Sequence, residues 1–316
     1  MLLLLLSYVL IFSVALMLVA FGGMFSERSG VINIGLEGTM VFGGFVGLIV
    51  LNAMNAANFH PVLVVLITTI VAIVVGMLYS LLLAVACVTL KADQTLVGTA
   101  MNLLATALAI IVSKRMSDRG ASTSIQYNKD AFIFKLFGVE MNVFLIVGII
   151  ALVAAIIVLY KLRFGLRLKA CGENPSAADS VGINVTKYRY AGVLISGALA
   201  GIGALAYILP TQSFWNSASG VAGFGFLALA VMIFGQWKPA RISIVAVFFS
   251  LFLSLSFIYN GIFNEIFGRY LTAADGVTSD LFKMIPYILS LLLLAFTSKN
   301  HHAPKAEGIP YDKEAR

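Results

Sequence analysis

Charged residues are scarce in this sequence, which excludes an ordinary water-soluble domain. Asp, Glu, Lys and Arg make up 11% of the 316 residues, whereas soluble domains contain about 25%. Hydrophobic residues reach 60%, and no polar linker divides the chain. Such a chain cannot bury its apolar residues in one aqueous core. The sequence therefore predicts one transmembrane domain, residues 1–298, followed by a polar tail, residues 299–316.

Cysteine and histidine are also scarce, which argues against metal and redox chemistry. Cys87 and Cys171 match no metal or redox motif, and His60, His301 and His302 lie outside the apolar segments. The sequence has no G-x-x-x-x-G-K-[ST] phosphate loop and no H-E-x-x-H motif. We expect no catalytic residues, no metal and no directly bound cofactor. The energy for any active transport must then come from another protein or from an ion gradient.

Long apolar runs predict an all-α, polytopic membrane protein with about nine spans. A span needs about 20 mostly apolar residues, and lipid offers no partner for free backbone groups, so helices are expected. The first run lacks a basic flank and a small-residue cleavage site, so we expect it to be retained. The predicted spans are 2–23, 31–51, 61–87, 94–113, 142–160, 189–209, 220–235, 242–258 and 281–298.

Basic residues cluster in short loops, so the net charge of +7 indicates membrane topology rather than nucleic-acid binding. The loop 161–189 is rich in Lys and Arg, including Arg189, which places it in the cytoplasm by the positive-inside rule. Alternation then puts the amino terminus outside and the carboxyl terminus in the cytoplasm of a cell-membrane protein. The same rule puts other basic residues on the cytoplasmic side, namely Arg28, Lys91, Lys238, Arg241 and those of the tail.

Two segments differ from simple spans. Residues 26–38, SERSGVINIGLEG, mix polar residues and glycines with apolar ones. Segment 220–235 is short, about 24 Å as a helix, and begins with Gly220, Gly223 and Gly225. Short or glycine-interrupted segments favour a transport path, although some are only irregularities of packing.

Glu37 is the most informative residue, because a carboxylate inside a span costs about 2.5–3.5 kcal/mol on insertion scales. A partner, water or protonation must offset this cost. Asn33 lies one turn earlier, on the same face if the turn is helical. Three interpretations remain open: a polar patch lining a solute path, a structural hydrogen-bonded cluster, and a residue near the interface.

A second polar group follows Asp93. Thr95, Thr99 and Asn102 are spaced for one face of a helix. Such a stripe faces a wet cavity or joins helices. We favour helix contact for Thr99 and the cavity for Asn102.

Small residues at G-x-x-x-G spacing predict close helix packing rather than a site. The two pairs are Gly43 with Gly47 and Gly197 with Gly201.

The loop 161–189 contains a helix-start pattern. Asn174 is a good cap, Pro175 suits the first helical position, and Gly182 suits the end. A short helix to about Val181 would lie under the membrane. It could dock a soluble partner, or it could bind anionic lipid.

Two stretches together resemble the permeases of ABC importers for branched-chain amino acids, simple sugars and nucleosides. Residues 30–38, GVINIGLEG, resemble the first signature of the nucleoside-type branch. The second signature resembles the coupling loop that docks on the ATPase subunit, and its matching residues are Gly172, Glu173, Asn174, Pro175, Ala177, Ala178 and Gly182.

This resemblance implies a type II ABC importer fold. It also implies a separate ATP-binding subunit that uses ATP and Mg²⁺, a second related permease, and an extracellular solute-binding lipoprotein. Two features do not confirm the family pattern: sugar-type members have about ten spans and begin inside, and no clear internal repeat is visible.

The resulting hypothesis is a permease subunit that carries nucleosides, purine nucleosides first, by alternating access. A ribose-like sugar or an amino acid is the alternative solute. An ion-coupled secondary transporter and a non-transporting scaffold are the competing classes. A nucleoside needs stacking surfaces and hydrogen bonds, and the candidate path residues are Asn33, Glu37, Asn102, Phe224 and Phe226.

Overall fold

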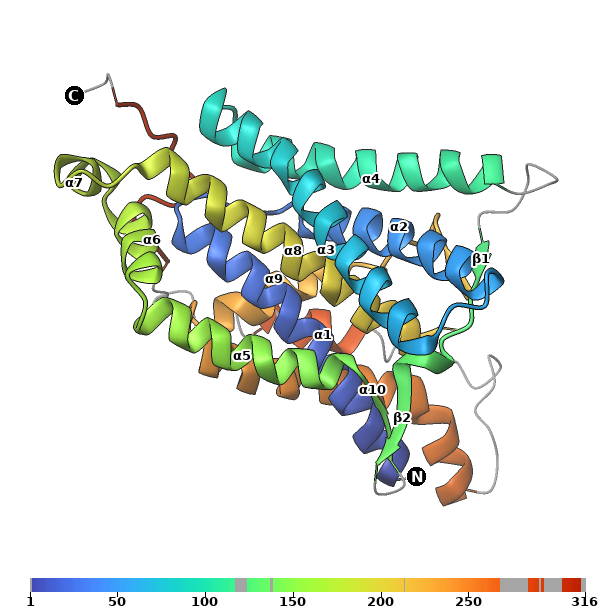
Figure 1. Cartoon of the computed structure of the whole chain (residues 1–316). Coiled ribbons are helices and arrows are strands. Elements are labelled where there is room, and N and C mark those ends of the chain that lie inside the picture. The colour runs from blue at the N-terminus through green and yellow to red at the C-terminus, as the bar shows by residue number, and fades with distance from the viewer. Residues whose placement is uncertain are drawn as a thin grey trace.

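The computed structural model describes residues 2–116, 124–136, 139–212, 214–267, 284–289, 291–292 and 303–313. These residues form a helical bundle with four short strands (Figure 1). The helices are α1 (Leu2–Arg28), α2 (Leu36–Ala56), α3 (Pro61–Ala84), α4 (Gln94–Met116), α5 (Phe144–Tyr160), α6 (Arg163–Glu173), α7 (Pro175–Ser180), α8 (Val185–Thr211), α9 (Phe224–Phe234) and α10 (Pro239–Phe267). A π-helical turn, η1 (Val85–Thr89), extends α3, and a 3₁₀ turn, η2 (Asp130–Phe132), precedes β2.

The strands form two small antiparallel pairs. β1 (Ser124–Gln126) pairs with β4 (Phe214–Asn216), and β2 (Ile133–Leu136) pairs with β3 (Val139–Asn142). The first pair joins parts of the chain that are far apart in sequence, with Ile125 opposite Trp215. Within the described residues, the strands lie away from α6 and α7, at the other end of the bundle (Figure 1).

Six helices of the described part are long and apolar enough to cross a membrane: α1, α2, α3 with η1, α4, α8 and α10. The count reaches seven if α5 and α6, which are bent by 69° at their junction, are taken as one span. The protein is therefore a multi-pass helical membrane protein. The predicted total of nine stays a prediction, because most of segment 281–298 lies outside the described residues.

Segment 220–235 was expected to be a span, and the structure does not confirm it. Only the 11 residues of α9 are helical, which is about 16 Å, half of a hydrocarbon core of about 30 Å. Gly220, Ala222 and Gly223 have φ of 56°, 53° and 81°, a backbone region that a right-handed helix excludes. These residues end the preceding turn and start α9 within the bundle.

α8 is the centre of the bundle and packs against α1, α2 and α3. Small residues allow this approach, as the G-x-x-x-G spacing predicted. A Cβ atom on Gly43 would lie 3.1 Å from the Cα atom of Gly201, and one on Gly197 would collide with the carbonyl oxygen of Gly76. The close-packing interpretation of these glycines is confirmed.

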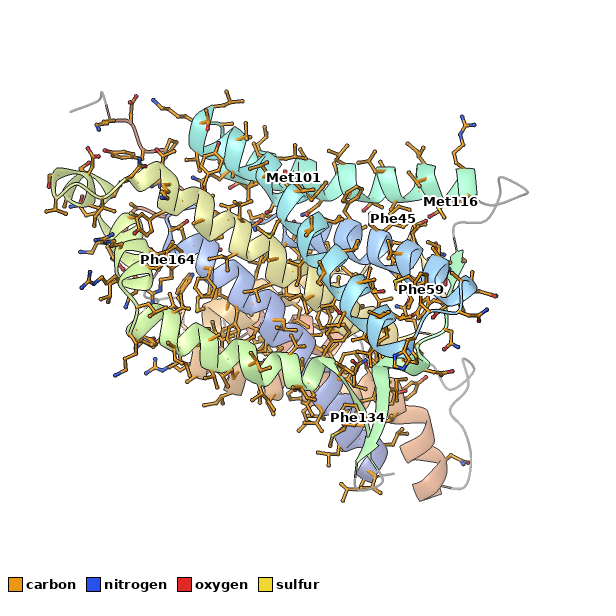
Figure 2. All side chains as sticks on the ribbon, viewed as in Figure 1. Phe45, Phe59, Met101, Met116, Phe134 and Phe164 are labelled. Carbon is orange, nitrogen blue, oxygen red and sulfur yellow. The ribbon has the colours of Figure 1, made fainter. Side chains whose placement is uncertain are left out.

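Apolar side chains cover the outer faces of α3, α4 and α5 (Figure 2). Leu78, Leu103 and Ile150 are 61%, 75% and 62% exposed. Leucines and isoleucines exposed at this density suit hydrocarbon rather than water. The outer faces of these helices therefore suit a membrane environment.

The bundle has an α7 end and a strand end (Figure 1). At the α7 end, the Arg28 guanidinium lies 3.7 Å from Glu173, and Lys91 lies 2.7 Å from Asp312. Arg28 also donates to the carbonyl of Trp237, the residue before Lys238. Arg28, Lys91 and the backbone next to Lys238 thus lie at one end. Which end faces the cytoplasm stays a prediction.

Candidate functional site

The chain leaves helical geometry between α1 and α2. Gly30 has φ of 96°, the backbone of Ile32 donates to Gln94 Oε1 at 2.6 Å, and α2 begins only at Leu36. The interrupted character of 26–38 is confirmed. The condition for Asn33 and Glu37 to share a helix face is not met, because Asn33 precedes α2.

Asn33 holds this break against the core helix. Its side chain is fully buried, and Nδ2 donates to Ser196 Oγ of α8 at 2.9 Å. Its Oδ1 atom is buried without a hydrogen-bond partner among the described residues. Asn33 thus has a structural contact and one unused acceptor; its role in a path stays a prediction.

Glu37 lies in the first turn of α2 and binds the start of α9. Its Oε1 accepts from the Gly223 backbone N–H at 2.8 Å, and its Oε2 accepts from the Gly225 N–H at 2.7 Å. A helix amino terminus favours an anion through its free N–H groups and its dipole. Gly225 permits the approach, since a Cβ there would lie 2.6 Å from the Glu37 nitrogen. The carboxylate thus joins the beginnings of two helices inside the bundle.

Asn102 of α4 makes two hydrogen bonds to the backbone at the start of α2. Its Oδ1 accepts from the Gly38 N–H at 2.7 Å, and its Nδ2 donates to the Ile34 carbonyl at 3.0 Å. The structure therefore gives Asn102 a helix-joining contact, where a cavity was favoured. Thr99, expected to join helices, is exposed and donates within its own helix to Thr95 and Leu96 carbonyls.

The two candidate aromatic residues differ in burial. Phe224 is buried and stacks on Tyr207, with ring centroids 4.2 Å apart. Phe226 is 46% exposed. Tyr287 donates to the Ala222 carbonyl at 3.2 Å, beside the start of α9. The sequence did not indicate Tyr207 or Tyr287 as site residues, because each lies in an apolar run without a distinguishing pattern.

The helix-start pattern in the loop 161–189 is confirmed. Asn174 Oδ1 accepts from the Ala177 N–H at 3.0 Å, Pro175 is the first residue of α7, and Gly182 has φ of 83°. The preceding α6 was missed. Apolar Phe164, Leu168 and Cys171 recur at helical spacing there, and this signal could have revealed it.

The residues that resemble a coupling loop divide into a packed group and an exposed group. Gly172 packs against the end of α1, where a Cβ would collide with the Arg28 carbonyl oxygen. Ala178 is buried against Cys171 and Val185. Glu173, Asn174 and Ala177 are exposed, and the exposed group is the surface available to a partner.

Residues 303–313, which the sequence presented only as a polar tail, bind the α7 end. The Ala306 N–H donates to the Gly172 carbonyl at 2.8 Å, and Arg189 Nη1 donates to the Ile309 carbonyl at 2.9 Å. Arg189, counted with the basic loop 161–189, lies in α8 and is buried. Burial raises the pKa of the Glu307 carboxyl to about 6, although a hydrogen bond with Glu27 and the nearby Arg28 oppose this shift.

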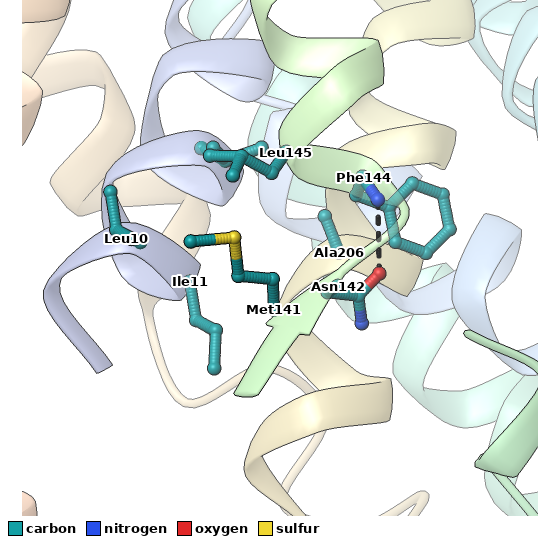
Figure 3. Close-up of a pocket in the computed structure, with 8 residues that line it drawn as sticks. Leu10, Ile11, Met141, Asn142, Phe144, Leu145 and Ala206 are labelled. Atoms are coloured by element: carbon teal, nitrogen blue, oxygen red, sulfur yellow. Dashed lines mark hydrogen bonds between the residues drawn. The ribbon is translucent and has the colours of Figure 1, made fainter. Parts of the chain in front are cut away.

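Pockets differ sharply between the two ends. A pocket beside α1, β3 and α5 measures only about 10 Å³ (Figure 3), no more than one water needs. It is lined by Met141, Asn142 and apolar residues, and it is too small for a solute. A groove of about 610 Å³ lies at the α7 end, between Lys91, Asp179, Asn184 and Tyr311. Within the described residues, no group of His, Cys, Asp or Glu could hold a metal ion.

Comparison with known proteins adds family evidence. Residues 5–294 match the family described as "Branched-chain amino acid transport system / permease component". The nucleoside ABC transporter permease protein NupC of Lactococcus lactis is 37% identical, over 96% of this chain and 95% of the relative. The guanosine ABC transporter permease protein NupQ of Bacillus subtilis is 35% identical, over 97% and 96%. A second Lactococcus lactis protein, the nucleoside ABC transporter permease protein NupB, is 34% identical over 35% of this chain and 30% of the relative. No solved structure matches.

Proposed function

Because this chain belongs to the permease family of branched-chain amino acid transport systems, we propose that it is the permease subunit of an ATP-driven nucleoside importer. The near full-length identity to permeases named for nucleosides and for guanosine carries the choice of solute. The chain itself is a translocating subunit and not an enzyme.

The proposed mechanism is alternating access within a type II importer fold of about nine spans. ATP binding, with Mg²⁺, in a separate ATPase subunit would move α7 through its exposed residues. A second permease and an extracellular lipoprotein would complete the complex. In Lactococcus lactis two different proteins carry the name of nucleoside permease, which supports a pair of unlike permeases. The α7 end would then face the cytoplasm and the amino terminus the outside.

The proposed path passes the start of α9, where Glu37 and Phe226 lie. A carboxylate accepts hydrogen bonds from ribose hydroxyls and base N–H groups, and an exposed phenyl ring can stack on a base. Glu37 is half-buried and Phe226 is exposed, which supports a role in contact with solute. Asn33, Asn102 and Phe224 would hold the starts of α2 and α9 in place and so position these two residues.

Competition for uptake tests the solute and the energy source. The full complex is expressed in cells that lack other nucleoside carriers, and entry of radiolabelled guanosine is measured. We expect unlabelled nucleosides to compete, ribose not to compete, and uptake to survive collapse of the ion gradients by ionophores. Competition by ribose alone would indicate a sugar permease. Uptake that collapses with the gradient and persists without the ATPase subunit would indicate a secondary transporter.

A further inference from the structure

The short helix α9 is held at both of its ends. At its start, two backbone N–H groups donate to Glu37, as described above. At its other end, the chain turns sharply into α10, and Gln236 and Trp237 both have φ of 52°. Trp237 is 3% exposed. Two consecutive left-handed residues that are not glycine require strong local contacts to hold them.

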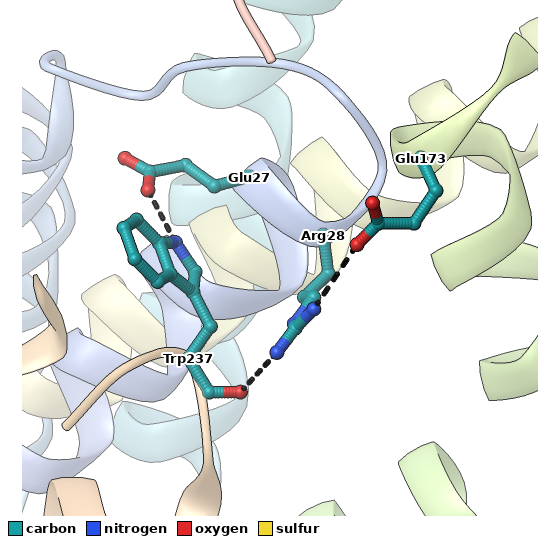
Figure 4. A network of polar contacts seen from close by, with 4 residues as sticks. All are labelled: Glu27, Arg28, Glu173 and Trp237. Carbon is teal, nitrogen blue, oxygen red and sulfur yellow. Dashed lines mark hydrogen bonds and ion pairs between the residues drawn. The ribbon is translucent and has the colours of Figure 1, made fainter. Parts of the chain in front are cut away.

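Trp237 makes those contacts with the last turn of α1 (Figure 4). Its indole Nε1 donates to Glu27 Oε2 at 2.6 Å. Its carbonyl oxygen accepts from Arg28 Nη2 at 3.2 Å. The side chain and the backbone of one residue thus bind two consecutive residues of α1, and the turn between α9 and α10 follows the end of α1.

Arg28 also reaches the coupling loop. Its Nη1 lies 3.7 Å from Glu173 Oε1, which precedes α7 (Figure 4). Gly172 packs directly on the Arg28 backbone, so this contact does not depend on the ion pair alone. The end of α1 is therefore shared by the coupling loop on one side and the α9–α10 turn on the other.

We propose that Trp237 is the positioning residue that transmits movement of the coupling loop to α9 and hence to Glu37. An 11-residue helix is about 16 Å long and moves as a rigid unit, so displacement of its end displaces its start. Packed elements of this kind switch between discrete arrangements rather than deform gradually. The inference rests on the proposed function, since it needs an ATPase that moves the coupling loop.

Trp237→Phe tests this role, because it keeps an aromatic ring and removes the indole donor. In proteoliposomes with the complete complex, ATP hydrolysed per guanosine transported should rise roughly five- to tenfold, the effect of one lost hydrogen bond on an equilibrium. Trp215→Phe is the matched control. It also removes a buried indole bond, Nε1 to the Gly220 carbonyl at 2.9 Å, but leaves the α1 contacts intact, so the ratio should not change. An unchanged ratio in Trp237→Phe would overturn the proposal.

Spin-label distances separate transmission from a merely structural role. Labels at Val181 beside α7, and at Ala230 of α9, are each measured against a label at Leu78 of α3. ATP should change both distances in the parent complex. In Trp237→Phe, the Val181 distance should still change and the Ala230 distance should not. If both still change, or if both are lost, Trp237 does not transmit the movement.

Glu27 provides a second route to the same test if Trp237→Phe fails to fold. Glu27→Gln keeps an acceptor for the indole and should retain the parental ratio, whereas Glu27→Leu should raise it. Equal ratios in the two variants would overturn the inference. A parent complex without ATP-driven guanosine uptake would instead refute the proposed function, so the two failures are distinguishable.

Discussion

Replacing Glu37 by glutamine should destabilise the protein and impair uptake. The substitution keeps one acceptor oxygen but places an NH₂ group against the N–H of Gly223 or Gly225, each of which now donates to the carboxylate within 2.8 Å. Loss of one hydrogen bond to a charged group costs about 1.5–3 kcal/mol. Loss of the charge at a helix amino terminus adds about 0.3–1 kcal/mol. The expected loss in the free energy of unfolding is therefore about 2–4 kcal/mol.

The measurement is thermal unfolding of the purified permease in nanodiscs, together with guanosine uptake by the complex. For a chain of this size, 1 kcal/mol corresponds to about 2 °C in Tm, so Glu37→Gln should unfold about 4–8 °C lower. Uptake should fall because the start of α9 is no longer held on α2.

Asp93→Asn is the matched control for this experiment. The exposed Asp93 Oδ1 accepts from the Leu96 N–H at 2.8 Å, and asparagine caps a helix about as well as aspartate. Its Tm should stay within about 1 °C of the parent, because the cap is kept. Loss of a helix cap would cost about 1 kcal/mol, which corresponds to about 2 °C in Tm. If Glu37→Gln also stayed within that range with full uptake, the assignment of Glu37 as the residue joining α2 and α9 would be refuted.

Three further predictions concern packing and the α7 end. Ala177→Leu should reduce guanosine-stimulated ATP hydrolysis without lowering Tm, because Ala177 is exposed. Ala178→Leu should lower Tm, because Ala178 is buried. The reverse pattern would contradict the division of this loop into exposed and packed residues. Gly197→Ala should destabilise by about 1–3 kcal/mol, measured as Tm, because the added Cβ meets the backbone of α3; an unchanged Tm would contradict that packing. The raised pKa of Glu307 means that docking of residues 303–313 is favoured fully below pH 4.5 and weakens as pH rises through about 6. A spin label at exposed Lys305 should become more mobile over that window, and Glu307→Gln should weaken this pH dependence.

Local chemistry explains what the sequence could predict. Asn174 and Gly182 determine the ends of α7 through contacts within a few residues, and both interpretations are confirmed. The apolar runs and the glycine pairs can likewise be recognised in the sequence, because burial in lipid and close helix packing each require particular residue types. The two ends of α7 could therefore be predicted from the sequence alone, although α6 before it was missed.

Long-range contacts explain the errors. The partners of Glu37 lie 186 and 188 residues away in the sequence, so its spacing from Asn33 could not reveal them. Asn102 was assigned to a cavity because an amide in a span fits either interpretation, and only the position of α2 decides between them. Trp237 and the tail residues had no local signal at all, since their roles arise from segments that meet at the α7 end.

Guanosine accumulation in proteoliposomes tests the central claim most directly. The permease is reconstituted with its ATPase subunit, its second permease and its lipoprotein, without any ion gradient, and ATP with Mg²⁺ is supplied on the ATPase side. Labelled guanosine should cross to the ATPase side only when ATP is hydrolysed, and the poorly hydrolysed analogue ATPγS should not support transport. Guanosine movement that is equal with and without ATP, or no movement while the complex hydrolyses ATP, would contradict it.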